Sequence, residues 1–487
     1  MRFDGSNAAI TLDTGTFSII NYANNEDVKI LSDNGSGGVT NYFEANGASG
    51  ETRLYNYGNL KLTTTTTGIT VTGEVAASQD YPNFRPTLDF NFAATKKLDS
   101  RISYQRTGPA SFTDEFGKVV LVGDNAPRFD HDPITRECKG LLIEHGRTNQ
   151  WLYSEDIATY VTGGYLQQST VADTTATTDP TGGTNAVKMA ATATGGAHSF
   201  YRNFTSGSNG DVHTFSIWVK AAGVDYARIY VDTVGGNMNG PGVTFSTKNV
   251  WNVSATGVAT QTRTSAVEYP NGWWKLSVSG SFSNRNDYYC HVDLEGGEAD
   301  VSFTGNGSDG MYVWGAQFET GSFVTSYIPT NGAAESRGAD FPVIVEENFS
   351  DVINQTEGTL IAEYDNVTSD GYVLSLDGSG GNKIGMVNSN SYQLMGTAGG
   401  SSQGTTDNGT LLSGTNRFAL AYKTNDAAIS INGNTATVDT SYTLPTTTFM
   451  SIGHRQYQYD QLGSCIARIM YYNTRLPNSQ LKTLSTR

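Results

Sequence analysis

The triplet Asp130-His131-Asp132 has the residue types for metal or proton chemistry, and Glu144 and His145 follow a short way along the chain. Paired carboxylates beside a histidine can ligate a metal ion or divide the roles of general acid and general base. Neighbouring residues of a strand point to opposite faces, so the triplet converges on one atom only if the chain bends there. The element that carries these residues therefore decides whether they form a site.

A structural explanation of the same residues needs no reaction. Asp132-Pro133 would fix a turn, and Asp130 would pair with Arg128 or Arg147. We favour this explanation and predict no catalytic residue in the triplet.

A second group of acids lies between Asp293 and Asp300, where Glu295 and Glu298 form the densest pair. Glycoside hydrolysis needs two carboxylates roughly 5 to 9.5 Å apart, and nothing in the sequence marks such a pair. A solvated turn, or a calcium site of the kind found in β-sandwiches, explains the group as readily. No HExxH or phosphate-loop motif occurs. We therefore predict no cofactor, with calcium as the alternative kept open.

Aromatic side chains are better candidates for binding, because Trp and Tyr rings stack on the apolar faces of sugars. Two adjacent aromatic pairs lie in strand-like runs, so one member of each pair should be core and the other exposed. Another group lies in a loop, where sandwich folds place their sites. Packing or subunit contacts are the alternative for each residue, and Trp218 and Trp314 are assigned to such packing. The candidate glycan-binding residues are Trp273, Trp274, Tyr288, Tyr289, Arg455, Tyr457 and Tyr459.

Composition indicates an all-β chain. The 487 residues are 37% hydrophobic and 16% charged, with 55 glycines, and the abundant Thr, Ser, Asn and Gly favour strands and turns. The net charge of −16 argues against a nucleic-acid groove and against an electrostatic membrane patch. No apolar run of about 20 residues occurs, so we predict no membrane insertion. The N-terminus lacks the basic and apolar regions of a signal peptide.

Three cysteines, Cys138, Cys290 and Cys465, are far apart in the sequence. A disulfide framework would be even in number and denser, and a zinc site would need paired ligands at short spacing. Free thiols in a chain folded in a reducing cytoplasm are the expected state.

The chain is predicted to have four sections. Residues 1–78 form a β-rich stalk or attachment domain, and residues 79–150 form a linker or hub. Residues 151–337 and 338–487 each show enough alternating strands for a two-sheet sandwich. The strands of the first section are too short and too polar to bury a core alone. An oligomeric stalk, in which copies close each other's edges, is favoured over a monomeric sandwich.

Several phrases resemble those of a known class of proteins. The phrases Pro127–Asn149 and Met311–Thr330 together resemble a module of tail-fibre and receptor-binding proteins of tailed bacteriophages. The piece Leu54–Val75 is similar to stalk regions of fibres from phages of marine bacteria. The 151–337 section, with Trp314-Gly-Ala-Gln317, resembles a carbohydrate-binding-module jelly roll. The last section resembles laminin-G-like, concanavalin-type sandwiches, in which the final strand runs into a short helix.

This resemblance implies a structural virion protein: a tail fibre, assembled in the host cytoplasm, that mediates adsorption to host surface polysaccharide. It implies a homotrimer that joins other phage tail proteins, such as an adaptor or baseplate. Several weak sugar sites on one rigid fibre would add up to firm attachment. The alternatives are a tailspike depolymerase that cleaves host polysaccharide and a purely architectural adaptor or capsid fibre.

Overall fold

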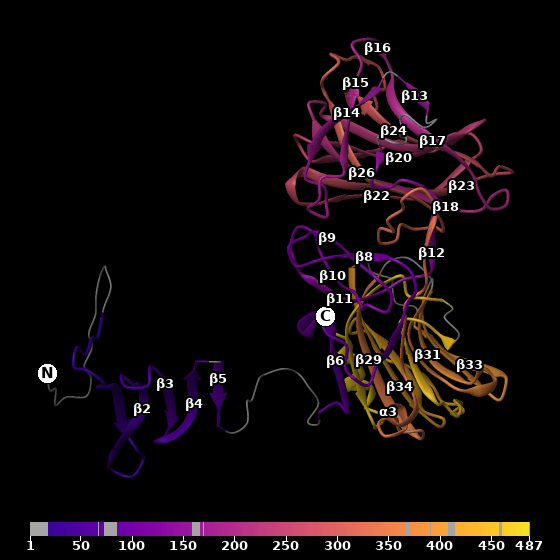
Figure 1. The fold of residues 1–487 in the computed structure, drawn as a ribbon. Helices are drawn as coiled ribbons and strands as arrows, with labels where there is room; N and C mark the ends of the chain where they lie inside the picture. The colour runs from indigo at the N-terminus through magenta and orange to yellow at the C-terminus, as the bar shows by residue number, and fades with distance from the viewer. Residues whose placement is uncertain are drawn as a thin grey trace. The chain divides into compact units, whose positions relative to one another are not determined.

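The structure is a computed structural model, and it describes residues 18–66, 68–72, 85–157, 166–168, 170–366, 371–389, 391–407, 414–456 and 460–486. The chain divides into two compact units, Met1–Asp80 and Tyr81–Arg487, called unit 1 and unit 2 below. Nearly all regular structure in both is antiparallel sheet, so the all-β prediction is confirmed (Figure 1). The helices are α1 (Phe92–Thr95), α3 (Glu346–Ser350), α4 (Asn478–Ser485) and the 3-10 turns η1 (Pro270–Gly272) and η2 (Ser379–Gly381).

Unit 1 contains one five-stranded sheet in sequential order. Its strand register gives the sheet two unlike faces. Phe43, Leu54, Leu62 and Val71 lie opposite one another across four strands, and this row is called the apolar row. Two residues of the row, Leu54 and Val71, are exposed, and the other two are partly buried. The strands are β1 (Val28–Asp33), β2 (Val39–Ala45), β3 (Thr52–Asn56), β4 (Asn59–Thr65) and β5 (Gly68–Val71).

The opposite face of this sheet is polar and bonded within itself. Arg53 lies 3.2 Å from Glu44 and 2.5 Å from Glu51, and the Tyr55 hydroxyl donates to Glu44 at 2.9 Å. The polar face is therefore satisfied within the sheet, whereas the apolar row has no second layer among the described residues of unit 1.

The first sandwich of unit 2 contains two six-stranded sheets. Alternate residues of both sheets point inward to one core, which includes Phe200, Ile229 and Val292 from sheet A and Phe215 and Leu276 from sheet B. Sheet A runs in the order β13 (Leu166–Gln168), β17 (His198–Thr205), β24 (Asp287–Glu295), β19 (Tyr226–Thr233), β20 (Gly236–Thr244) and β21 (Asn249–Asn252). Sheet B runs in the order β14 (Thr170–Thr177), β15 (Ala186–Ala191), β26 (Gly310–Thr320), β18 (His213–Ala222), β23 (Trp273–Phe282) and β22 (Ala259–Glu268). A short ribbon pairs β16 (Gly195–Gly196) with β25 (Phe303–Thr304).

The C-terminal sandwich packs two larger sheets around a second core. Sheet C runs in the order β10 (Phe129–His131), β11 (Cys138–Ile143), β38 (Ser464–Tyr472), β29 (Glu357–Asn366), β34 (Gly414–Lys423), β35 (Ala427–Ile431) and β36 (Thr437–Asp439), and β6 (Leu88–Asn91) also pairs with β38. Sheet D runs in the order β33 (Ser401–Asp407), β32 (Ser391–Ala398), β31 (Lys383–Ser389), β30 (Gly371–Asp377), β37 (Phe449–Ile452), β28 (Phe341–Ile344) and β7 (Ser103–Gln105). The expected C-terminal helix is α4, whose Leu481 and Leu484 pack on the outer side of sheet C.

The segment expected as a separate linker or hub, residues 79–150, contributes strands to this second sandwich. Strands β6, β10 and β11 belong to sheet C, and β7 belongs to sheet D. Figure 1 shows the purple hub strands beside the orange strands of the C-terminal sandwich. The reason is that β38 would otherwise expose a bare sheet edge. The C-terminal sandwich is thus built from two segments separated along the chain.

The first sandwich is inserted between these two segments. The chain enters it through β12 (Arg147–Asn149) and leaves through β27 (Glu335–Arg337), and these two strands pair with each other. A hairpin of β8 (Ala110–Thr113) and β9 (Val119–Val122) completes the hub.

Candidate functional site

Three neighbouring strands of sheet A share an outer face rich in aromatic and charged residues. In β17, β19 and β24 every second residue enters the core, so the intervening ones lie together on the other side. Tyr201, His291 and Tyr230 lie directly opposite one another across these strands. Tyr289 lies two residues before His291 on the same side. These four residues are called the aromatic face.

The rings of the aromatic face are stacked across the strands. The His291 ring lies 4.4 Å from the ring of Tyr201, with 19° between the planes, and 4.3 Å from that of Tyr230, with 9° between the planes. Tyr289 and Tyr201 are 6.2 Å apart and tilted by 56°. The three tyrosines are half-buried, so part of each ring meets solvent. Nearly parallel rings with centres this close lie face to face, so the His291 ring is enclosed between those of Tyr201 and Tyr230 in a stack three strands wide.

Charged groups flank the stack on the same face. Arg228 lies 2.8 Å from Glu295 and 3.4 Å from Asp293, and its guanidinium lies over the Tyr230 ring at 5.1 Å. Burial raises the pKa of Glu295 to about 7 and that of Asp293 to about 6, against the opposing effect of Arg228. Two acids, Asp293 and Glu295, thus lie beside one base, Arg228, next to the aromatic face. This arrangement disfavours an acidic ligand there.

The outer end of the same face is closed by an indole ring. A side chain on Gly242 would meet the ring of Trp251 at 2.2 Å, so the ring lies directly on the glycine. Glu298, expected as part of an acidic cluster, accepts from Thr244 at 3.1 Å and from Asn249 at 2.5 Å. These contacts hold the loop after β24 against β20 and β21.

The predicted tyrosine pair divides between the two sides of β24. Tyr288 is fully buried in the core, and Tyr289 is half-buried on the aromatic face. Its partners Tyr201, Tyr230 and His291 are absent from the sequence-based candidates. Their alternation with core residues was visible, but the register that aligns three separate strands was not.

The predicted tryptophan pair differs from expectation. Trp273 and Trp274 do point to opposite sides, but both are buried, with 1% and 6% of their surface exposed. Trp274 enters the sandwich core, whereas Trp273 joins a second cluster with Trp218, Trp314 and Val119. The second side of sheet B is covered because Val119 of the hub packs on it. Neither indole presents a free face to a sugar in this structure.

The loop candidates lie in the C-terminal sandwich. Arg455 pairs with Asp460, and both are partly exposed. Tyr457 and Tyr459 lie outside the described residues. The loop candidates and the aromatic face belong to different sandwiches.

The triplet Asp130-His131-Asp132 contains the bend that convergence requires. The register of β10 shifts between Asp130 and His131, and both residues line one cavity. Asp132 instead accepts the backbone N–H groups of Ile134 and Thr135 at 2.9 and 2.8 Å, which confirms the predicted turn. Asp130 accepts the N–H of Thr113 at 2.7 Å. The expected pairing of Asp130 with Arg128 is wrong, because Arg128 binds other acids.

Those other acids form a buried ion network in the hub. Arg128 lies 2.7 Å from Glu144 and 2.5 Å from Asp340, and Arg337 lies 2.9 Å from Glu144. Glu144 also accepts from Ser326 at 2.6 Å. Burial opposes ionisation of Glu144, but Arg337 and Arg128 outweigh it and hold its pKa well below the usual range.

The described ranges contain neither an arranged group of metal ligands nor a helix able to span a membrane. No group of three or more His, Cys, Asp or Glu side chains is arranged there to hold a metal ion. None of the helices in those ranges has the length and apolar content of a membrane span. The expected free thiols are confirmed for Cys138, Cys290 and Cys465.

The paired antiparallel sheets of unit 2 define an all-β chain with β-sandwich domains. No protein family model matches the chain, and no curated protein does. Among solved structures, domains LG4-5 of the mouse laminin α1 chain are 9% identical, with a TM-score of 0.22; the match covers 59% of this chain and 88% of that one. A Trypanosoma rangeli sialidase in complex with DANA is 12% identical, with a TM-score of 0.23; the match covers 61% of this chain and 60% of that one. At these TM-scores neither likeness carries an argument, and the fold class rests on the sheets themselves.

Proposed function

We propose that this protein is a structural attachment protein of the phage tail-fibre class, which adsorbs to surface glycans through the aromatic face of its first sandwich. The observation that carries this proposal is the stack of Tyr201, His291 and Tyr230 across three rigid strands. The exposed parts of the tyrosine rings supply apolar area and hydroxyl groups at low entropic cost. Because acids flank the stack, neutral glycans fit better than acidic ones.

Oligomerisation is part of the same proposal. The apolar row of unit 1 leaves Leu54 43% exposed and Val71 42% exposed on one side of a single-layer sheet. A contiguous exposed apolar surface marks an interaction site. We infer that copies of the chain cover this row in a homotrimer, whose other end joins further tail proteins. Several weak sites on one assembly would then give firm attachment.

The test is binding of the purified full-length protein to an array of bacterial surface polysaccharides. We expect the wild type to bind neutral glycans and Tyr230→Ala to weaken that binding at least about tenfold, as loss of a central aromatic contact should. Phe116→Ala, which changes a 66% exposed aromatic ring elsewhere in unit 2, is the matched control and should bind as the wild type does. Unchanged binding by Tyr230→Ala, or no binding by the wild type, would refute the proposal. Release of reducing ends would instead identify the depolymerase alternative.

A further inference from the structure

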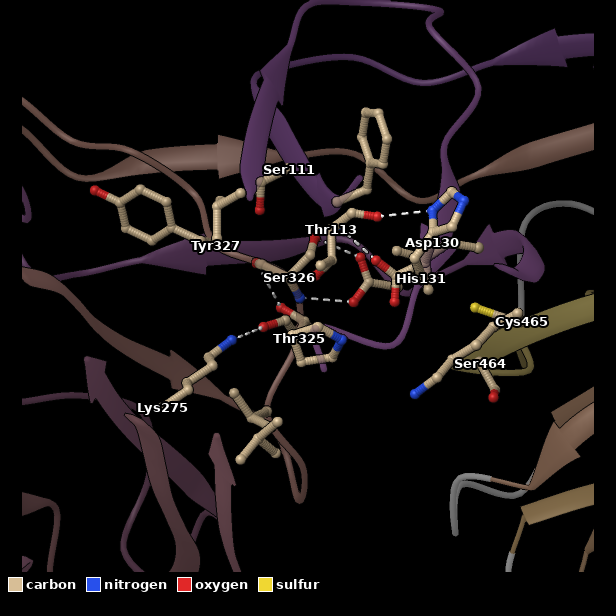
Figure 2. Close-up of a pocket in the computed structure, with 18 of the residues that line it drawn as sticks. Ser111, Thr113, Asp130, His131, Lys275, Thr325, Ser326, Tyr327, Ser464 and Cys465 are labelled. Carbon is tan, nitrogen blue, oxygen red and sulfur yellow. Dashed lines mark hydrogen bonds between the residues drawn. The ribbon is translucent and has the colours of Figure 1, made fainter. Parts of the chain in front are cut away.

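A cavity of about 270 Å³ lies inside unit 2, where the hub meets both sandwiches (Figure 2). The hub contributes Asp130 and His131, sheet B of the first sandwich contributes Lys275, and β38 contributes Ser464 and Cys465. Lys139, with 37% of its side chain exposed, is also among the lining residues, so the cavity reaches the surface. The volume suits a molecule of about the size of one monosaccharide, since pockets for drug-sized ligands start near 300 Å³.

Lys275 provides the cationic wall of the cavity. Its ammonium group lies 4.5 Å from the centre of the Trp218 ring and donates to the carbonyl oxygen of Thr325 at 3.1 Å. An ammonium group has three donors, so this bond leaves capacity for a ligand. Burial lowers the pKa of Lys275 to about 8, against the opposing effect of Glu319. The charge is therefore costly to hold without an anion beside it.

The ion network next to the cavity has positive charge in excess. Arg106, Arg128 and Arg337 are buried there together with only two carboxylates, Glu144 and Asp340. Lys275 adds a further positive charge. Glu319 and Arg147 lie 3.8 Å apart and offset each other. Asp130 and Asp365 also line the cavity, so the charges around it nearly balance. No carboxylate among the described residues pairs directly with the Lys275 ammonium, however, and a bound anion would supply that partner.

The other wall offers hydrogen-bond acceptors. Nδ1 of His131 lies 3.0 Å from the carbonyl oxygen of Thr113, which can only accept, so Nδ1 carries the proton and Nε2 is the acceptor in the neutral ring. His131 is 4% exposed, and its Nε2 has no hydrogen-bond partner in the structure. Asp130 adds a carboxylate on the same wall. Hydroxyl groups are the neutral donors that suit such acceptors.

We propose that this cavity binds a small hydroxylated carboxylate, with its carboxylate group on Lys275 and its hydroxyl groups on His131 and Asp130. The ion pair with Lys275 is shielded from water by apolar residues such as Val119, Leu142 and Tyr269, and a low local dielectric strengthens it. The site is separate from the aromatic face, and it prefers an anionic ligand where the aromatic face prefers a neutral one.

The first test compares two sugars of one ring shape on the full-length wild type. Calorimetric titration with D-glucuronate should show saturable binding at least about tenfold tighter than with D-glucose, which lacks the carboxylate. Equal affinities, or no glucuronate binding at millimolar concentration, would overturn the proposal. Tyr230→Ala should bind glucuronate as the wild type does, which separates this site from the proposed glycan surface.

Matched lysine variants locate the site. Lys220 lies on the neighbouring strand over the Trp273 ring at 5.9 Å, much as Lys275 lies over Trp218, but it does not line the cavity. Lys275→Met should weaken glucuronate binding at least about tenfold, whereas Lys220→Met should leave it unchanged. Equal effects of the two variants would contradict the assignment.

A second variant keeps the test decisive if Lys275→Met does not fold. His131→Asn preserves a donor for the Thr113 carbonyl and removes the acceptor at Nε2. It should weaken glucuronate binding severalfold, and an unchanged affinity would count against the proposal.

Discussion

Glu144 joins the parts of unit 2 that the sequence keeps apart. It accepts bonds from Arg128, sixteen residues before it, and from Arg337 and Ser326, which follow the first sandwich. All these groups are buried or nearly so. Removing one charge from such a network leaves the others uncompensated in a medium that solvates them poorly. Stability, and not reactivity, is what this residue contributes.

We expect Glu144→Gln to lower the free energy of unfolding of unit 2 by about 3–5 kcal/mol, the usual cost of breaking a buried ion pair. Urea denaturation followed by tryptophan fluorescence measures this. Glu363→Gln is the control, because Glu363 pairs with Arg417 at 2.9 Å in a partly exposed position. Such a pair contributes only about 0–1 kcal/mol. Similar losses for the two variants would show that the hub network is not the stabilising feature described.

At the scale of elements, strand β11 depends on a glycine. Gly140 has a φ of +103°, and a β-carbon there would lie 2.1 Å from the carbonyl oxygen of Ile466 in β38. Any other residue would be strained by its own backbone and would push the two strands apart. The register of β11 on β38, and with it the closing edge of sheet C, therefore depends on this position.

Gly140→Ala should destabilise unit 2 by more than about 1 kcal/mol and expose the amides of Leu141, Leu142 and Ile143 to hydrogen exchange. Mass spectrometry of exchanged peptides resolves this segment. Gly123→Ala provides the matched control in the same hub, since a β-carbon there meets nothing within 4 Å. Protection of β11 that survives in Gly140→Ala would argue against the strain described here.

Sequence patterns predict the strands themselves better than they predict which strands pair or pack together. Alternation located Trp273-Trp274-Lys-Leu and Tyr288-Tyr289 on strands and predicted that the two tyrosines would point to opposite sides, without specifying which one enters the core. Alternation says which residues share a face, but not what covers that face. Trp273 is buried because a hairpin more than 150 residues earlier packs on it. The stack on His291 depends on the register of three strands, and no local signal specifies such a register.

At the scale of the whole molecule, the two units differ in how they cover the faces of their sheets. Unit 2 covers every large sheet with another layer, and its C-terminal sandwich does so only by including hub strands. Unit 1 has one layer, with its apolar row left open. Unit 2 is a self-contained folding unit, whereas unit 1 depends on a partner in the assembly we propose.

Fragments should reflect this organisation. We expect residues 81–487 to fold with the far-ultraviolet dichroism and cooperative melting of unit 2. Residues 338–487 should not fold, since they lack β6, β7, β10 and β11 and would expose the inner sides that Leu88, Leu141 and Ile143 cover. Circular dichroism and proton NMR of the two fragments measure this. A well-dispersed NMR spectrum from 338–487 would show that the hub strands are dispensable.

The pairing of β38 with β6 has a consequence for synthesis. Arg468 bonds Asp89 at 2.6 Å across a sequence separation of 379 residues. A ribosome adds about 5–20 residues per second, so β6 waits between about 20 and about 75 s for its partner strand to be made. During that time the first sandwich can be completed, because all its strands lie within the interval. The edges of β6 and β11 therefore stay unpaired for the longest time during synthesis and are the most available to a chaperone.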